Sequence, residues 1–207
     1  MDWLPISAAL LVTGALALCL GSFLLPPTDG TAETLRIVQH RGGQWLTVAA
    51  ILFIASVCLT LGLPAILSLF DRRGWVLALV SAIVLEIGFI GTAGFSMLMV
   101  FLRSLVITDA LRDQGLEDAT SEAGLATFLY VWIVALYLGE LLLGFALLRA
   151  RATPRWVPFA LIAHAASVLV APVLPDAVGK ALILLSVAAF CGIAIQANAS
   201  TTRRRPD

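Results

Sequence analysis

The 207-residue chain is 60% hydrophobic and only 13% charged, with a mean hydropathy of +1.01 and no net charge. Soluble globular domains carry about a quarter charged residues, so this composition excludes a soluble globular protein. It also excludes a basic nucleic-acid-binding surface, because thirteen basic residues are balanced by thirteen acidic ones. We therefore expect a single all-α transmembrane domain over residues 1–207.

Six apolar runs follow one another along the chain. An α-helix needs roughly 20 apolar residues to cross the hydrocarbon core of a bilayer. We predict a bundle of six transmembrane helices, over residues 3–25, 45–70, 75–102, 125–148, 156–174 and 177–197. The N-terminus has neither the positive region nor the small-residue cleavage site of a signal peptide, so the first run is predicted to be a retained span.

Two longer polar segments interrupt these runs, at residues 26–44 and 103–124. The first is predicted to contain a short surface helix over 31–41, broken by Gly42 and Gly43. The charged residues of the second are mostly acidic, and it is predicted to form a short amphipathic helix followed by a loop. The remaining connections are short, so we expect neighbouring helices to be antiparallel.

The basic residues predict the orientation of the bundle. Eight fall on the side of the two termini: Arg72, Arg73, Arg149, Arg151, Arg155, Arg203, Arg204 and Arg205. The other side carries five, diluted over the longer segments: Arg36, Arg41, Arg103, Arg112 and Lys180. The positive-inside rule therefore predicts that both termini are cytoplasmic and that both long loops lie outside.

Three ionisable residues lie deep inside the predicted spans. Counting about 1.5 Å per helical residue from the inner edge puts Glu86 about 16 Å deep, and Glu140 and His164 about 14 Å deep. Thr13 and Thr60 fall at a similar depth. A charge in a membrane costs at least about 2.5 kcal/mol on insertion scales, so such residues mark functional sites by default.

Acid–base chemistry is what a site of this kind could perform. One of Glu86 and Glu140 would act as the general acid, and the other carboxylate or His164 as the base. The fourth predicted span adds aromatic walls for a developing positive charge, from Tyr130, Trp132 and Tyr137. Thr13 and Thr60 are candidate substrate contacts. The alternative interpretation is structural: each carboxyl bonds one neighbouring helix, His164 is a satisfied bundle residue, and the aromatic residues only pack.

Motifs for metal, redox or nucleotide chemistry are missing from the sequence. It contains no HExxH, CxxC, Walker loop, GxGxxG or DDxxD pattern. Its three cysteines, Cys19, Cys58 and Cys191, are odd in number and lie in apolar runs, so we expect free thiols. No cofactor, metal or nucleic-acid partner is predicted, and no oligomeric state is assigned.

The sequence resembles small multi-pass membrane proteins of actinobacteria. The likeness rests on an HRGGQWL entry into the second span, an RRGW turn and a TPRWVPFAL entry into the fifth. It implies a bacterial inner membrane and no residue-level roles, because such families are mostly of unassigned function. The general layout is also similar to that of integral-membrane terpene cyclases, which place acidic residues in a helical bundle to protonate an isoprenoid.

Three functions are compatible with these observations. The first is an intramembrane enzyme, such as a cyclase or isomerase, acting on a lipid-like or isoprenoid substrate drawn from the membrane lipid. The second is a proton-coupled transporter of a small organic solute or cation. The third is an accessory membrane subunit without chemistry. The enzyme is favoured because the aromatic residues cluster on the predicted helix that carries Glu140, whereas the internal repeat that a carrier would favour is faint.

Overall fold

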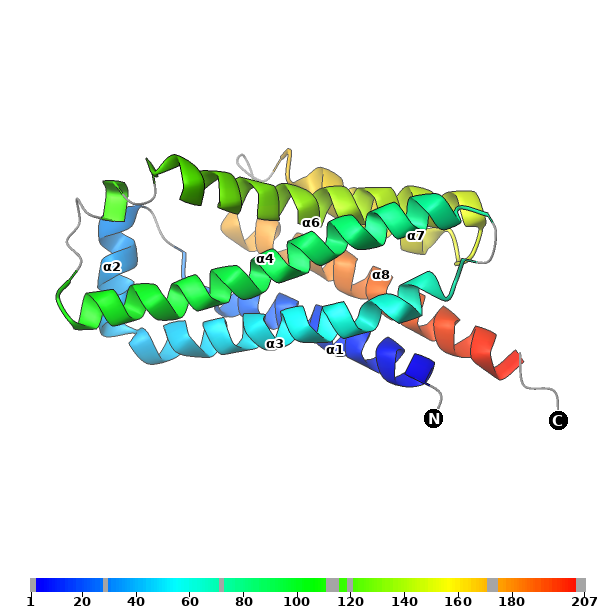
Figure 1. The fold of residues 1–207 in the computed structure, drawn as a ribbon, viewed down its shortest axis with the longest axis horizontal. Helices are drawn as coiled ribbons and strands as arrows, with labels where there is room; N and C mark the ends of the chain where they lie inside the picture. The colour runs from blue at the N-terminus through cyan, green and yellow to red at the C-terminus, as the bar shows by residue number, and fades with distance from the viewer. Residues whose placement is uncertain are drawn as a thin grey trace.

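A computed structural model describes residues 3–27, 30–70, 73–110, 116–118, 121–170 and 175–203, without the side chains of 176, 177 and 201–203. These residues contain helices and no strand, as predicted. The helices are α1 (Trp3–Leu24), α2 (Thr31–His40), α3 (Gly42–Leu67), α4 (Trp75–Ile107), α6 (Ala123–Ala150), α7 (Trp156–Ser167) and α8 (Asp176–Arg203). All but α2 run along one elongated bundle, and α2 lies across its end (Figure 1).

Among the described residues, five helices are long and apolar enough to cross a membrane: α1, α3, α4, α6 and the Val178–Ser200 part of α8. The fifth predicted span, over 156–174, is shorter than expected. Its helix α7 has 12 residues and ends at Ser167. At about 1.5 Å per residue it is about 18 Å long, against a bilayer core of about 30 Å. A turn follows over 168–170, and 171–174 lie outside the described residues.

The start of α8 nevertheless lies beside the far end of α1. The Nζ atom of Lys180 donates to the Leu25 carbonyl over 2.9 Å. From there α8 runs back along the bundle, and both ends of the chain lie at the same end of the molecule (Figure 1). The chain therefore returns along the bundle between α6 and α8, although α7 covers only part of that length.

The predicted surface helix is present as α2. Its apolar side chains, Leu35, Ile37 and Val38, are buried against a cluster that includes Trp45 and Met99. The indole Nε1 of Trp45 donates to the Met99 carbonyl over 2.9 Å, which ties the start of α3 to α4. This amphipathic helix closes the end of the bundle opposite the chain termini.

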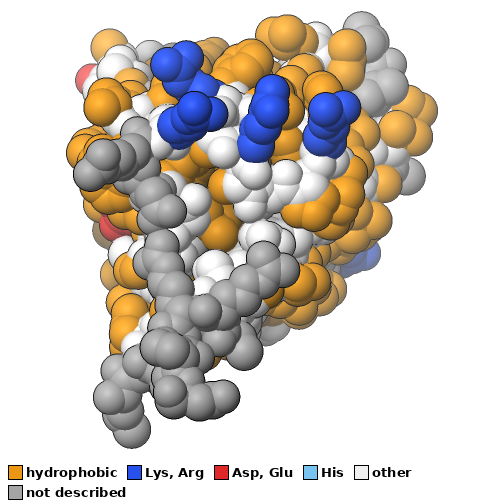
Figure 2. Space-filling model, turned by 90° about the vertical axis from the view of Figure 1, so that its right-hand side faces the viewer, with side chains coloured by type: hydrophobic (Ala, Val, Ile, Leu, Met, Phe, Trp, Pro, Cys, Tyr) orange, Lys and Arg blue, Asp and Glu red, His pale blue; other side chains and the backbone are white. Residues whose placement is uncertain are grey.

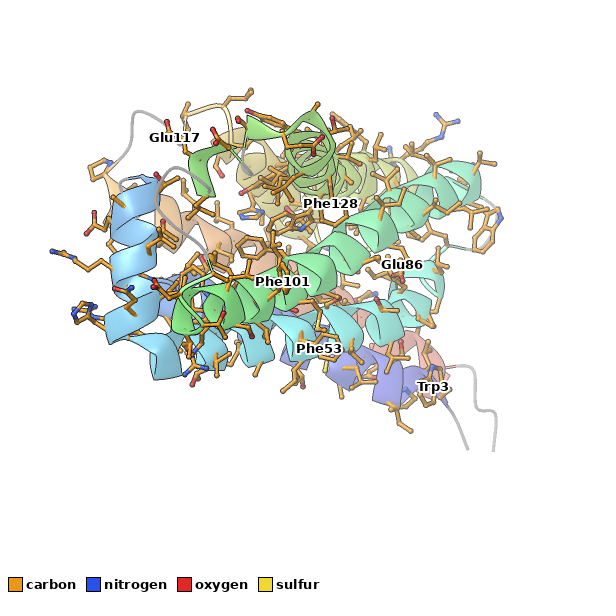
Figure 3. All side chains as sticks on the ribbon, turned by 60° about the vertical axis from the view of Figure 1, so that its left-hand side comes forward. Trp3, Phe53, Glu86, Phe101, Glu117 and Phe128 are labelled. Carbon is orange, nitrogen blue, oxygen red and sulfur yellow. The ribbon has the colours of Figure 1, made fainter. Side chains whose placement is uncertain are left out.

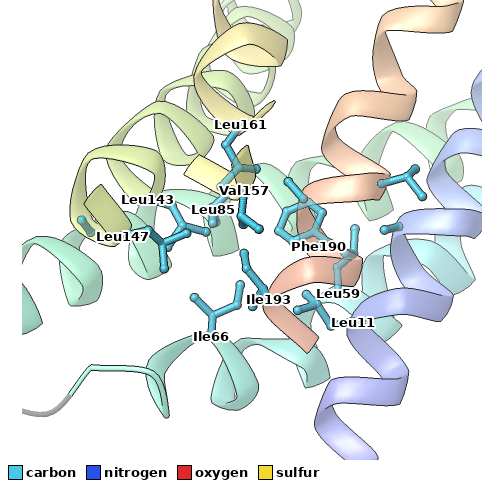
Figure 4. Close-up of a cluster of buried hydrophobic side chains, with 14 of the residues drawn as sticks. Leu11, Leu59, Ile66, Leu85, Leu143, Leu147, Val157, Leu161, Phe190 and Ile193 are labelled. Atoms are coloured by element: carbon cyan, nitrogen blue, oxygen red, sulfur yellow. The ribbon is translucent and has the colours of Figure 1, made fainter. Parts of the chain in front are cut away.

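The bundle has an apolar core and an apolar outer surface. Side chains from α1, α3, α4, α6, α7 and α8 meet in the core (Figure 4), among them Leu11, Leu59, Leu85, Leu143, Leu161 and Phe190. On α4, Ile83, Ile87 and Ile90 recur at helical spacing and are about half exposed. An exposed apolar face of this extent is typical of a surface that contacts lipid.

Glycines bring α4 and α6 into close contact. A Cβ atom on Gly88 would lie 2.9 Å from the Leu136 backbone, and one on Gly91 would lie 2.5 Å from the Trp132 ring. From the other side, a Cβ on Gly139 would lie 2.9 Å from the Leu85 backbone nitrogen. Small residues let membrane helices approach closely and gain van der Waals contact. We call the close contact of α4 and α6 around Gly88 and Gly139 the α4–α6 seam.

The basic residues gather at the end that carries the chain termini. Figure 2 shows a row of Lys and Arg side chains on this end. The described residues there include Arg73, just before α4, Arg149 in the last turn of α6, and Arg151 and Arg155 between α6 and α7.

At the opposite end of α6, the backbone N–H groups of Gly124 and Leu125 lower the pKa of the Glu122 carboxyl, because they stabilise its ionised form.

A serine from α1 forms hydrogen bonds with the backbone of α3 beside its internal proline. Pro64 has no N–H and disturbs the hydrogen-bond ladder of the helix in which it lies. The buried Ser7 hydroxyl accepts from the Ala65 N–H over 3.1 Å and donates to the Leu61 carbonyl over 2.8 Å. It therefore bridges two backbone groups on either side of the proline and joins α1 to α3.

Ser7→Ala is accordingly expected to lower the free energy of unfolding by about 1–3 kcal/mol, the usual cost of leaving buried polar groups unpaired. Unfolding of the purified protein by SDS in mixed micelles measures it. Ser104→Ala is the control, because that hydroxyl is exposed and, among the described residues, bonds only within its own helix, to the Val100 carbonyl. Equal effects of the two substitutions would rule out the bridging role of Ser7.

Candidate functional site

Glu140 on α6 and His164 on α7 form a buried pair. The Glu140 Oε2 and His164 Nδ1 atoms lie 2.5 Å apart. Only 1% of the Glu140 surface and 5% of the His164 surface are exposed. The two residues come from antiparallel neighbouring helices, and each supplies the main polar partner of the other in an apolar surrounding.

Gly144 makes this approach of α7 to α6 possible. A Cβ atom there would lie 2.7 Å from the Ile162 side chain and 3.1 Å from the Pro158 carbonyl. Gly144 is one helical turn after Glu140, and α7 runs in the opposite direction. Because α7 lies directly on Gly144, His164 comes level with Glu140.

Tyr137, one helical turn before Glu140 on α6, contacts the histidine of the pair. The structure puts its ring on His164, with centroids 5.4 Å apart and planes tilted by 37°. Tyr137 therefore covers the imidazole and restricts its orientation.

The imidazole lines a half-open cavity of about 260 Å³ between the helices. Side chains from six helices line it, including the polar residues Ser22, Thr92 and Ser167 and the aromatic residues Trp132 and Tyr137. His164 belongs to this lining and Glu140 does not. Because Nδ1 is engaged by Glu140, Nε2 is the ring nitrogen left to act on a molecule in the cavity.

Of the two other predicted aromatic residues on α6, one reaches the cavity. Trp132 stacks on Phe95, with ring centroids 4.7 Å apart, and its Nε1 donates to the Thr92 hydroxyl over 3.0 Å. Tyr130 is 71% exposed and lies on the outer surface of the bundle. Trp132 is thus a wall of the cavity, whereas Tyr130 is separate from it.

Glu86 is placed apart from the pair. Its Oε1 atom accepts a hydrogen bond from the Thr60 hydroxyl over 3.2 Å, between α4 and α3. Figure 3 shows Glu86 where these two helices run side by side. Its Oε2 atom is buried and has no hydrogen-bond partner among the described residues. Neither Glu86 nor Thr60 lines the His164 cavity, and Thr13 is exposed on α1.

The predicted site residues therefore do not form one site. His164, Tyr137 and Trp132 line one cavity with Glu140 behind His164, whereas Glu86 and Thr60 form a second contact elsewhere. Thr13 and Tyr130 are exposed and belong to neither group. Within the described residues, no group of three or more His, Cys, Asp or Glu side chains is placed to hold a metal ion.

Sequence reasoning missed the polar lining residues Ser22, Thr92 and Ser167 and the aromatic residue Phe95. Ser167 carried a usable signal, because it lies one turn after His164 on the same helix face. In the structure its hydroxyl donates to the His164 carbonyl over 2.6 Å. Thr92 and Phe95 lie in a run of small and apolar residues, where nothing in the sequence distinguishes them.

A Glu–His pair of this geometry is suited to proton transfer. A carboxylate that accepts the Nδ1–H fixes the tautomer and leaves Nε2 free to accept a proton from the cavity. The same carboxylate stabilises the imidazolium once that proton has been taken. Known proteins offer no further guide to the reaction, because no protein-family model, curated protein or solved structure matches this chain.

Proposed function

We propose that this chain is an integral membrane enzyme that transfers protons to and from an apolar, lipid-like or isoprenoid substrate. His164 is the general acid–base group, and Glu140 is the residue that positions it. The observation that carries the proposal is the buried pair itself, whose imidazole lines a cavity while its carboxylate lies behind it.

The surroundings of the pair support an apolar substrate. Most of the cavity lining is apolar, with leucines from α1, α3, α6 and α8. Tyr137 also lines a groove of about 300 Å³ on the outer surface between α6 and α7. The other residues of that groove are aliphatic, among them Ile133, Val134 and Leu169. A molecule dissolved in the membrane would therefore meet Tyr137 between itself and His164.

The chemistry can be written with His164 alone as the proton carrier. Unprotonated Nε2 removes a proton from a carbon next to an electron-withdrawing group, and the imidazolium returns it to another carbon of the substrate. A carbon–carbon double bond of the substrate thereby changes position. The substrate gains and loses no atom, and the enzyme ends in its starting protonation state. The positive charge that develops in this step lies on the His164 imidazolium, and the Tyr137 ring packed on it can stabilise that charge by about 2 kcal/mol when desolvated.

Incorporation of deuterium at carbon tests this proposal. The purified protein, reconstituted with a total actinobacterial lipid extract in heavy water, is expected to yield a lipid with carbon-bound deuterium, detected by mass spectrometry. His164→Gln removes the proton carrier and is expected to abolish the label. Glu86→Gln, the matched control at the separate carboxyl, is expected to retain it. Equal labelling with the wild type and His164→Gln would refute the proposal.

A proton-coupled carrier is the second candidate function. It is favoured by the lining of the cavity, to which six helices contribute. Carriers bind their substrates at such interior sites. In sealed liposomes with choline as the probe cation, a carrier would produce a proton flux that is lost in His164→Gln, without any carbon-bound deuterium. The enzyme is expected to give the opposite pair of results.

We infer that the arginine-bearing end of the bundle faces the cytoplasm of a bacterial cell. The basic side chains at that end agree with the positive-inside rule. The predicted span over 156–174 would then complete the six crossings, with both termini inside. A C-terminal green fluorescent protein fusion is expected to fluoresce, and a C-terminal alkaline phosphatase fusion to be inactive. An active phosphatase fusion would reverse the orientation.

A further inference from the structure

A second, larger cavity adjoins the site at the end closed by α2. It has a volume of about 470 Å³ and lies between α2, α4 and α6. Its walls are almost entirely apolar, with Leu98 and Leu102 from α4 and Leu125 and Leu129 from α6. Several of these leucines are half-buried although they face between helices, because the cavity leaves them uncovered. We call it the α2–α4–α6 pocket.

The linings of this pocket and of the His164 cavity share one residue. Phe95 lines both. Its ring stacks on Trp132, which is held in turn by its hydrogen bond to Thr92. Movement of the single Phe95 side chain would therefore join the two cavities, while Trp132 stays in place.

The two cavities differ in chemistry. The His164 cavity holds the polar groups, from Ser22, Thr92, His164 and Ser167. The α2–α4–α6 pocket has only threonines of α2 among its polar side chains, and its remaining lining is apolar or glycine. A molecule that satisfies both cavities has a polar reactive end and an apolar chain. A passage opened by displacement of this one side chain would take one chain and not the pair of chains of a phospholipid.

We propose that the substrate is a single-chain amphiphile, with its polar end at His164 and its chain past Phe95 in the α2–α4–α6 pocket. This inference rests on the proposed role of His164 for the reactive end. The occupancy of the pocket by a chain is a separate claim and can be tested separately. Linear acyl and isoprenoid chains share the required chemistry, and the experiment distinguishes between them.

The test is photo-crosslinking with diazirine-bearing farnesol and diazirine-bearing palmityl alcohol in nanodiscs, followed by mapping of the labelled peptides. Crosslinks are expected on the α4 and α6 walls of the pocket, and unlabelled alcohol of the same kind is expected to compete them away. The probe that labels these walls identifies the chain. Labelling only of outward-facing residues, without competition, would overturn the proposal.

Two substitutions fill the pocket from opposite walls, Leu98→Trp on α4 and Leu129→Trp on α6. Each is expected to abolish the competed crosslinks. Met97→Trp is the matched control, because Met97 is the neighbour of Leu98 and is 61% exposed on the outer surface. It is expected to leave the crosslinks unchanged. If neither filled variant folds, the competed crosslinks in the wild type still decide the question.

The outcomes separate this inference from the proposed function. His164→Gln is expected to keep the crosslinks and to lose the deuterium label, because it leaves the α2–α4–α6 pocket intact. A deuterium label without competed crosslinks would refute the chain site and leave the acid–base role standing. Competed crosslinks without a His164-dependent label would refute the acid–base role and leave the chain site standing.

Discussion

Replacement of Glu140 by leucine is expected to lower the free energy of unfolding by about 3 kcal/mol and to abolish the deuterium label. The carboxylate is 1% exposed and lies 2.5 Å from the Nδ1 atom of His164. Its removal leaves the imidazole buried without its partner, and removal of one member of a buried polar pair is among the costliest single changes in a protein. SDS unfolding in mixed micelles measures the loss of stability.

The double variant Glu140→Leu/His164→Phe is expected to regain most of that stability and to remain inactive. Two apolar side chains of similar volume replace the pair without leaving an unpaired polar group. A double-mutant cycle from the two single variants and the double variant gives the interaction free energy, expected at about 2–3 kcal/mol. If the single costs simply add, the two residues are uncoupled, and Glu140 does not position His164.

Replacement of Gly88 by leucine is expected to destabilise the bundle by about 3 kcal/mol or to prevent folding, because overpacking of a closely fitted interface forces backbone shifts. A Cβ atom at this position would meet Leu136 backbone atoms at 2.9 Å, so α4 and α6 must separate. Because Trp132 and Thr92 bond across the same seam, any folded protein is also expected to lose that hydrogen bond.

Gly43→Leu is the control for the seam. Gly43 is exposed near the start of α3, and a Cβ atom there would meet nothing within 4 Å. Its replacement is expected to change the stability by less than about 1 kcal/mol, in the direction of helix propensity. SDS unfolding compares the two variants. Equal effects of Gly88→Leu and Gly43→Leu would mean that close packing at Gly88 does not hold α4 against α6.

The helices could be predicted largely from the sequence. Hydropathy defines a membrane helix strongly, because every backbone polar group in lipid must be satisfied within the segment. The first, second, third, fourth and sixth predicted spans each correspond to one helix, with ends that differ by a few residues. The fifth corresponds to a helix only over its first part, because hydropathy detects an apolar run even where the backbone stops being helical. Its helix α7 ends at Ser167, and residues 168–170 form a turn.

The site could be predicted only in part, because depth along a helix says nothing about rotation around it. Successive helical residues turn by about 100°, so Leu85 faces α6 at Gly139 while Glu86 faces α3 at Thr60. The glycines of the α4–α6 seam indicate how α4 is rotated around its axis. Gly88 and Gly91 mark the side of α4 that meets α6, and Glu86 is off that side. Contacts between helices, such as that of Glu140 with His164, depend on this rotation.

The ¹⁵N spectrum of the two histidine side chains in bilayers tests the pairing of Glu140 with His164 most directly. The chain has two histidines, and the exposed His40 at the end of α2 serves as an internal reference. Glu140→Gln is expected to shift the His164 Nδ1 signal and to leave His40 unchanged, while Glu86→Gln leaves both unchanged. If Glu86→Gln moves the His164 signal as far as Glu140→Gln does, or if neither substitution moves it, Glu140 and His164 do not form a separate proton-transfer pair.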